Sequence, residues 1–320
     1  MVDYRGHQYF LYSVVIFMTF LGLFGNLNLI LLHVRRPILR NKYGCLLTLL
    51  TTFQTYCVLS ESVNVAFGIA TMTSSYQIKR DFCYNFIFPD IFCNCVQTIL
   101  ITALSIDFLF CILFPIRHRN LSNGPYLSMI LSIALIYASY IIILGYVGTD
   151  DAIIKLCNPP TALPPQVATL WYRVAFIAAL ATSFAYVMSF SLIYFKAKAK
   201  TRPTTMQVEK KAMRSISVLL IVFILTRVST TLIINFLRFI NSSQEIITLV
   251  QDYNVIFAML LYSQNAYVCF IRSAEYRRMF LEQILPMTSC FCPCWSENIK
   301  TYTTNNSRPV LKPVLRYWNR

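Results

Sequence analysis

Residues 125–147 read PYLSMILSIALIYASYIIILGYV, without one charged side chain. A helix that crosses a lipid bilayer needs about 20 mostly apolar residues, and this segment is long enough. The whole chain shares its character: 57% of the 320 residues are hydrophobic, 13% are charged, and the mean hydropathy is +0.56. That composition is too apolar for an ordinary soluble domain. It indicates a polytopic membrane protein.

Six further apolar segments of spanning length occur along the chain. Together with the first, the expected helices cover residues 9–33, 43–70, 84–112, 125–147, 169–195, 214–237 and 249–271. Each is long enough to cross the bilayer. We therefore expect an all-α fold, a bundle of seven transmembrane helices. Residues 1–280 would form this domain, and 281–320, rich in Thr, Asn and basic residues, would be a flexible tail.

Basic residues gather in alternate connections between these segments. The connections after the first, third, fifth and seventh hold most of them, including Arg35, Arg36, Arg117, Lys210 and Arg277. Under the positive-inside rule, the N-terminus is expected outside and the tail in the cytosol. The net charge of +15 is thus mainly a topology signal, with attraction to anionic inner-leaflet lipid. Membrane lipid is an expected partner and nucleic acid is not.

Two cysteines are placed by this topology on the oxidising side. Cys83 begins the third helix at its outer end, and Cys157 lies in the outer loop 148–168. We expect a disulfide between them, the alternative being two unpaired thiols. The three cysteines that follow the last helix are a weak zinc signal and fit palmitoylation better; they are Cys290, Cys292 and Cys294. No metal or other cofactor is expected.

Polar side chains inside the expected helices are costly in lipid and therefore suggest function. Asp90 and Asn94 share one face of the third helix with Gln97, spaced four and three apart. Glu61 and Asp90 need a partner, which we expect to be Arg227, water or a ligand. An internal salt bridge that fixes helix packing fits the same residues. The candidate ligand-binding residues are Asp90, Glu61, Asn94, Arg173, Arg227 and Asn254.

The stretch 104–119, LSIDFLFCILFPIRHR, ends the third helix with an acid followed by an aromatic residue. The arrangement resembles the rhodopsin-like seven-helix receptors coupled to G proteins. That class places the arginine of an Asp-Arg pair 25 residues after the helix 3 cysteine. Here 83 + 25 gives Phe108, preceded by the matching Asp107. Asp107 is then left to pair with Arg117 or Arg119 in the adjoining loop.

Other motifs carry the same resemblance with departures. The class carries a Gly-Asn pair within its first helix, matched by Gly25-Asn26, and an aspartate 28 residues later in the second helix; here 26 + 28 gives Gln54. The N-P-x-x-Y motif of the class corresponds here to Asn265-Ala-Tyr-Val-Cys269. The stretch SAEYR follows it at the distance at which the class has a short helix that lies along the membrane. The resemblance implies switch or coupling roles for Asp107, Phe108, Gln54, Asn265 and Cys269. Asn26 is expected to hydrogen-bond to neighbouring helices.

More narrowly, the chain is similar to the nematode serpentine chemoreceptors of the Srsx class. FPIRHRNLS, GTDDAIIKLCNPPTALPP and SQNAYVCFIRSAEYRRMF carry this likeness, which extends to about residue 280. It implies a chemosensory receptor in the plasma membrane of a sensory cell. The receptor would bind an extracellular small molecule or peptide among its helices and signal to a heterotrimeric G protein. In members of the wider class that bind amines, an aspartate at the position of Asp90 pairs with the ammonium.

Two other classes of function remain open. Intramembrane Glu61, Asp90 and Arg227 also fit a small-solute transporter or a ligand-gated channel. The missing motif residues also fit a non-signalling seven-helix scaffold. An enzyme is not expected, because the sequence contains neither an HExxH motif nor a P-loop.

Overall fold

The computed structural model describes residues 4–74, 78–154, 157–199, 232–233, 236–237, 240 and 242–291. Within them the chain forms six helices of 26 to 35 residues: α1 (Tyr4–Arg35), α2 (Lys42–Ser74), α3 (Arg80–Leu113), α5 (Asn123–Gly148), α7 (Pro165–Ala199) and α10 (Gln244–Arg272). An 18-residue helix, α11 (Ala274–Phe291), follows. Long unbroken helices suit an apolar chain because each satisfies its own backbone hydrogen bonds.

Short elements join the long helices. They are η1 (Pro37–Leu39), α4 (Pro115–Asn120), α6 (Pro159–Ala162), and the strands β1 (Ile78–Lys79) and β2 (Ile153–Ile154). The strands pair antiparallel, with Ile78 opposite Ile154. They are a small departure from the expected all-α fold.

Six of the seven expected segments lie within helices, and each helix runs past the expected ends. The helix expected at 169–195, for example, begins at Pro165 and ends at Ala199. Hydropathy marks only the apolar stretch, whereas the helix continues into polar residues at its ends. The segment expected at 214–237 lies outside the described residues apart from 232–233 and 236–237.

Five of the described helices are long and apolar enough to cross a membrane. The stretches are Gly6–Arg35, Arg80–Leu113, Asn123–Gly148, Pro165–Phe195 and Asp252–Arg272. α2 has similar length but carries more polar side chains in its middle, among them Thr51, Gln54 and Glu61. Large apolar side chains such as Phe20 and Ile136 are exposed on these helices. Such extensive apolar exposure is what a lipid-facing surface requires.

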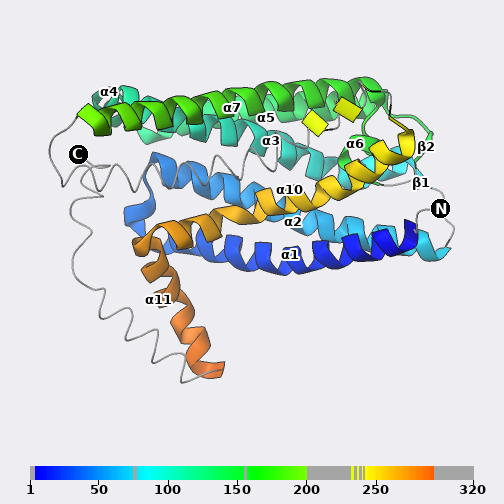
Figure 1. The fold of residues 1–320 in the computed structure, drawn as a ribbon, viewed down its shortest axis with the longest axis horizontal. Helices are drawn as coiled ribbons and strands as arrows, with labels where there is room; N and C mark the ends of the chain where they lie inside the picture. The colour runs from blue at the N-terminus through cyan, green and yellow to red at the C-terminus, as the bar shows by residue number, and fades with distance from the viewer. Residues whose placement is uncertain are drawn as a thin grey trace.

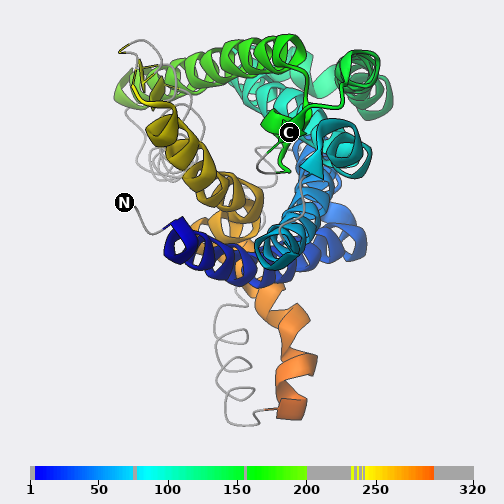
Figure 2. The same cartoon turned by 90° about the vertical axis from the view of Figure 1, so that its right-hand side faces the viewer.

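The long helices run roughly along one axis (Figure 1). One end, which we call the hairpin end, holds the start of α1, β1, β2 and α6; the other, the α4 end, holds α4, η1 and the start of α11. α3 packs against α2, α5 and α7, and α1 packs against α2 and α10. Figure 2 shows the same bundle viewed along its helices.

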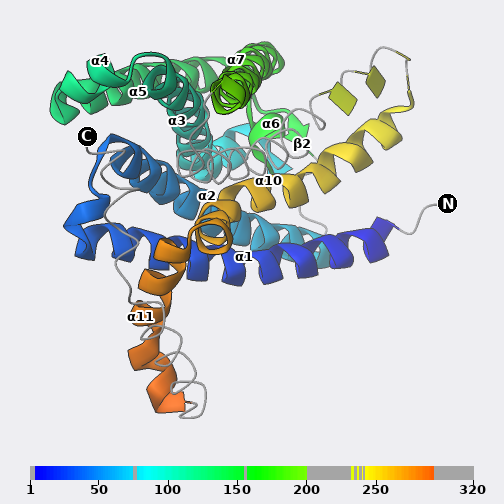
Figure 3. The same ribbon diagram turned by 60° about the vertical axis from the view of Figure 1, so that its left-hand side comes forward.

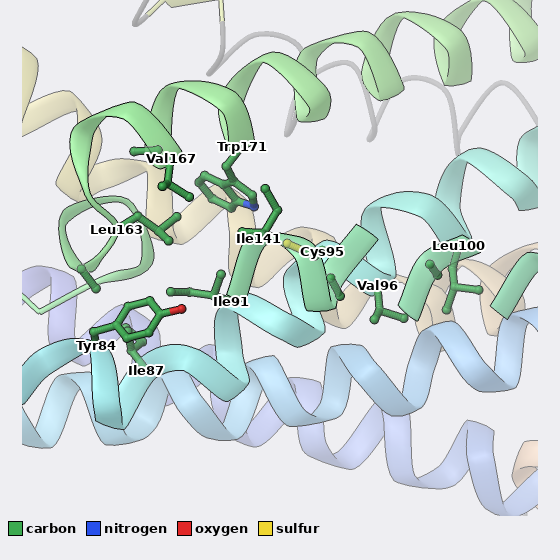
Figure 4. Packing of buried hydrophobic residues seen from close by; sticks show 14 of the residues in the cluster. Tyr84, Ile87, Ile91, Cys95, Val96, Leu100, Ile141, Leu163, Val167 and Trp171 are labelled. Atoms are coloured by element: carbon green, nitrogen blue, oxygen red, sulfur yellow. The ribbon is translucent and has the colours of Figure 1, made fainter. Parts of the chain in front are cut away.

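α3 supplies much of the main hydrophobic core (Figure 4). Its buried residues Ile87, Ile91 and Cys95 lie on one face with Val96 and Leu100 further along. Trp171 of α7 packs into the same cluster. α3 therefore forms the central column of the described bundle.

α5 approaches α3 closely because its facing residues are small. Ala134, Ala138 and Gly145 are buried there, and small residues let helix backbones come together in membranes. The hydroxyl of Tyr84 donates a hydrogen bond to the carbonyl of Ile142 at 2.7 Å. A Cβ atom on Gly145 would lie 2.4 Å from the same hydroxyl oxygen. Glycine at this position is thus required by the packing of Tyr84.

α11 turns away from the bundle at Ser273 (Figure 3). Its base is fixed to α1: Tyr276 Oη lies 3.2 Å from His33 Nε2, and Gln283 Nε2 donates to Asn28 Oδ1 at 2.9 Å. An ion pair of 2.9 Å joins Arg36 to Glu282. The helix expected from the SAEYR stretch is therefore present, and it extends to Phe291.

Candidate functional site

A cavity of about 150 Å³ lies among the helices at the hairpin end. α1, α2, α3, α6, α7 and α10 all contribute to its wall. Its polar lining residues are Gln8, Glu61, Asn64, Asn94, Asn158, Asp252 and Asn254. The remaining lining is mostly apolar or aromatic, as is usual for a small-molecule site.

The connection between α5 and α7 covers this cavity. Cys157, which lines the cavity, is joined to Cys83 at the start of α3 by a disulfide with a Cα–Cα distance of 5.6 Å. The bond expected from the sequence is therefore present. Backbone pairing of β1 with β2 ties the same connection to the chain that precedes α3. These two links hold the connection over the helix ends.

Local hydrogen bonds shape the covering segment. The Asn158 side chain accepts from the backbone N–H of Thr161 at 3.0 Å, and the Thr161 hydroxyl receives the backbone N–H of Asn158. This reciprocal cap starts α6 and places Pro159 and Pro160 in the cavity wall. Arg80 adds a bond from Nε to the Thr161 carbonyl at 3.3 Å.

Glu61 of α2 is the candidate carboxylate that reaches the cavity. Its side chain is 8% exposed, and it accepts a hydrogen bond from Asn64 Nδ2 at 3.2 Å. A carboxylate has more acceptor positions than one amide can fill. The remaining acceptor capacity of Glu61 is therefore available to a molecule in the cavity.

Asp90 of α3 is buried behind the lining rather than within it. It is 1% exposed and is not part of the cavity wall. Neither carboxylate oxygen accepts a hydrogen bond from the part of the chain that the structure describes, although the Cys57 thiol lies beside it. The carboxyl group of Glu61 is the other acid near it. Of the two candidate carboxylates, Glu61 therefore lines the cavity and Asp90 does not.

The other candidate ligand residues divide between cavity and surface. Asn94 and Asn254 line the cavity, and Asn94 Nδ2 donates to the hydroxyl of Tyr262 at 2.7 Å. Arg173 is exposed on α7 and does not line it. Arg227, the expected partner of Glu61 and Asp90, lies outside the described residues.

Several lining residues were not predicted. Asp252 lies two residues before Asn254 in α10, inside an expected helix. The cost of a charged side chain in lipid, which made Glu61 a candidate, therefore pointed to Asp252 as well. Gln8 lies just before the first expected segment, and a polar residue outside a membrane helix does not by itself indicate a binding site. Trp171 and Tyr172 are aromatic residues at an expected helix end, which marks them for packing and not for a site.

Residues 19–284 match the model of the family described as serpentine type 7TM GPCR chemoreceptor Srsx. The chain belongs to the Srsx family. The matched range includes the cavity-lining residues of every element except α1, whose lining residues Gln8, Leu11, Tyr12 and Val15 precede it. No curated protein matches the chain. The Srsx family is a family of chemoreceptors and not of enzymes.

Two motif positions of this Srsx chain meet in the centre of the bundle. Asn265 Nδ2 of α10 donates to Gln54 Oε1 of α2 at 2.7 Å, and Gln54 Nε2 donates to the Leu261 carbonyl at 3.3 Å. Gln54 is 1% exposed and Asn265 is 7% exposed. The neutral amide at the position of the usual aspartate therefore joins α2 directly to α10.

The Gly-Asn pair joins α1 to the same region of α10. Asn26 Nδ2 donates to the carbonyl of Tyr262 at 2.9 Å, which confirms the expected contact with a neighbouring helix. A Cβ atom on Gly25 would lie 3.0 Å from the Tyr267 ring and 3.1 Å from Ala266 Cβ. Gly25 thus allows α1 and α10 to pack closely.

Asp107, at the α4 end, is paired by His118 and Tyr126. His118 Nε2 and the Tyr126 hydroxyl each lie 2.8 Å from Asp107 Oδ1. The expected pairing with Arg117 or Arg119 is therefore wrong. Both arginines are exposed, because in the short helix α4 the central His118 faces α3 and its two neighbours face away.

Lys42 supports this pair from α2. Its Nζ donates to the carbonyl of His118 and lies 5.9 Å from the centre of the Tyr126 ring. Burial lowers the pKa of Lys42, and the Asp107 carboxylate acts in the opposite direction. We call Asp107, His118, Tyr126 and Lys42 the α4-end network. It joins α2, α3, α4 and α5.

Phe108, which stands in place of the usual arginine, has an apolar role. It packs with Ile112 against the buried Tyr186 and Ile193 of α7. Cys269 is partly buried beside Leu29 of α1, where a small apolar side chain fits. Cys290 lies in the last turn of α11, whereas Cys292 and Cys294 lie outside the described residues.

Proposed function

We propose that the chain is a chemosensory receptor of seven transmembrane helices that signals to a heterotrimeric G protein. The cavity beneath the disulfide-bonded segment carries this proposal, because it is concave, mostly apolar and supplied with a few convergent polar groups. An extracellular ligand binds there. Glu61, Asn94 and Asn254 contact it, and Asp90 acts from behind Glu61.

The distribution of charge supports an orientation with the hairpin end outside. The basic side chains Arg36, Arg40 and Lys42 lie at the α4 end, as do Arg117 and Arg277. Positive residues favour the cytosolic side of a membrane. A disulfide at the opposite end fits the oxidising outer side.

Signalling would be a shift between two arrangements of the bundle. A ligand favours the arrangement that it binds better, and a G protein that prefers the same arrangement raises the affinity for the ligand. The surface of α4 supports G-protein contact at the other end. Ile116 is 78% exposed there, and the basic residues Arg117 and Arg119 follow it in the same short helix.

We place the receptor domain at residues 1–280 and a cytosolic tail at 281–320. We locate the protein in the plasma membrane of a sensory cell, and attraction of the basic α4 end to anionic lipid would support it there. Cys290, Cys292 and Cys294 are candidate sites of palmitoylation that would add to membrane attachment.

Expression in cells with a calcium or cAMP reporter tests the receptor function. Pools of volatile, small polar and peptide compounds would be applied to wild type and to Ala175→Trp, which fills the cavity wall on α7. Ile177→Trp is the control, because Ile177 lies on the same helix and is 65% exposed. We expect a response in wild type and in the control, and its loss in Ala175→Trp.

The alternatives give different results. A ligand-evoked current that survives complete blockade of G proteins would identify a channel, and ligand uptake without any reporter signal would identify a transporter. Specific binding without a signal or transport would identify a non-signalling scaffold.

A further inference from the structure

Among the residues that the structure describes, the charged groups in the cavity wall all carry one sign. Glu61 and Asp252 line the cavity, and no lysine, arginine or histidine does so among the residues that the structure describes. Glu61 accepts one hydrogen bond from Asn64 Nδ2 and keeps further acceptor capacity for a molecule in the cavity. An acidic, largely apolar cavity favours a ligand that brings positive charge.

Among the described lining residues, Asn94 offers a further unused acceptor. Asn94 is 4% exposed and lines the cavity; its Nδ2 is used in the bond to Tyr262. Its Oδ1 accepts no hydrogen bond within the described part of the chain. A buried acceptor without a donor is costly, so a molecule in the cavity is expected to supply the N–H.

A further feature favours a cation over a neutral donor. The cavity wall holds the aromatic side chains of Tyr12, Trp171 and Tyr172. Aromatic faces attract ammonium groups, most strongly where water is excluded.

We propose, on the basis of the receptor function above, that the ligand is a small organic cation with a protonated amine on an apolar or aromatic body. The ammonium donates to the Glu61 carboxylate and to Asn94 Oδ1, and the body lies against the aromatic wall. Glu61 makes the charged contact, and Asp90, which does not line the cavity, does not touch the ligand.

The test compares ligands that differ only in the charge of one group. Purified full-length protein would be heated with phenethylamine, phenethyl alcohol or hydrocinnamate at equal concentration, followed by other amine, alcohol and carboxylate triplets. A bound ligand raises the melting temperature by mass action. We expect a rise with amines and none with their neutral or anionic counterparts.

Variants then test the named contact. Glu61→Gln is expected to weaken the apparent affinity for the amine by about tenfold to a hundredfold, the range for losing a charge-assisted bond. Asp151→Asn is the matched control, since it removes an exposed carboxylate at the same end outside the cavity. Glu61→Asp, which keeps the charge, is expected to retain the preference for amines if Glu61→Gln does not fold.

Each other outcome overturns the ligand class. These outcomes are equal stabilisation by alcohols or carboxylates, no stabilisation by any amine, and an unchanged affinity in Glu61→Gln. Failure of the receptor function is separate, because amine binding by the purified protein without a reporter signal contradicts only the signalling. A G-protein response to neutral or anionic ligands contradicts only the ligand class.

Discussion

His118 Nε2 lies 2.8 Å from Asp107 Oδ1, so a histidine eleven residues along the chain supplies the partner of the Asp107 carboxylate. Tyr126 donates to the same oxygen from α5. An acid that lacks its usual neighbouring arginine is therefore still paired. The pair lies between helices and not within one, so it depends on how α3, α4 and α5 are arranged.

His118→Ala should destabilise the protein and raise basal signalling. The substitution removes one of two donors from an almost fully buried carboxylate, a loss of about 1–3 kcal/mol for a charged group. Basal reporter activity would measure the change in signalling, and the melting temperature would measure the loss of stability. Arg119→Ala is the control, since Arg119 is exposed nearby. Equal effects from the two substitutions would contradict a restraining role for His118.

Gln54 and Asn265 should be energetically coupled. Gln54→Leu, Asn265→Leu and the double variant form a cycle that isolates their 2.7 Å bond. We expect a coupling of about 0.5–1.5 kcal/mol, because both amides are buried. Melting temperatures of the purified variants give an apparent value. Additive effects of the two single substitutions would mean that the bond contributes nothing to stability.

Gly145→Ala should destabilise the contact between α3 and α5. The added methyl would lie 2.4 Å from the Tyr84 hydroxyl oxygen, and overpacking of this kind costs about 1–3 kcal/mol. Gly124→Ala is a matched control in the same helix, since no atom lies within 4 Å of its Cβ position. We expect a lower melting temperature only for Gly145→Ala. A Tyr84→Phe background should relieve part of the loss.

Removing the disulfide should reduce both stability and ligand response. The double variant Cys83→Ser, Cys157→Ser frees a segment that lines the cavity, and disulfides contribute about 2–4 kcal/mol. Thermal unfolding and reporter dose–response curves would measure the two effects. Cys45→Ser, which changes a free and partly exposed cysteine, is the control. A normal response in the double variant would show that the covering segment does not shape the ligand site.

Phe108→Arg should alter basal signalling and not restore an Asp107–arginine pair. Asp107 Oδ1 is already engaged by His118 and Tyr126, while a guanidinium at this position would enter the apolar contact with Tyr186. Phe108→Leu should be tolerated because it keeps that contact. Basal and evoked reporter signals compare the two. An unchanged signal in Phe108→Arg would show that position 108 is not important for the switch.

The membrane class, the disulfide and most of the helices follow from the sequence, because hydropathy and charge asymmetry act over many residues. The details of pairing do not. Nothing in the spacing distinguishes His118 from Arg117 as the partner of Asp107; the orientation of α4 decides it. Likewise, Glu61 and Asp90 are both acids within expected membrane helices, and the sequence does not distinguish them. The orientation of α3 buries Asp90 behind the cavity wall.

α3 carries both Asp90, behind the cavity, and Asp107, in the α4-end network. They are 107 − 90 = 17 residues apart, or about 25 Å along a continuous helix. A stiff rod of this length transmits axial rotation or sliding from one end to the other. We therefore expect a change that repositions α3 near Asp90 to displace Asp107 relative to His118 and Tyr126 as well. In the receptor function proposed above, ligand sensitivity and the resting signal would then change together.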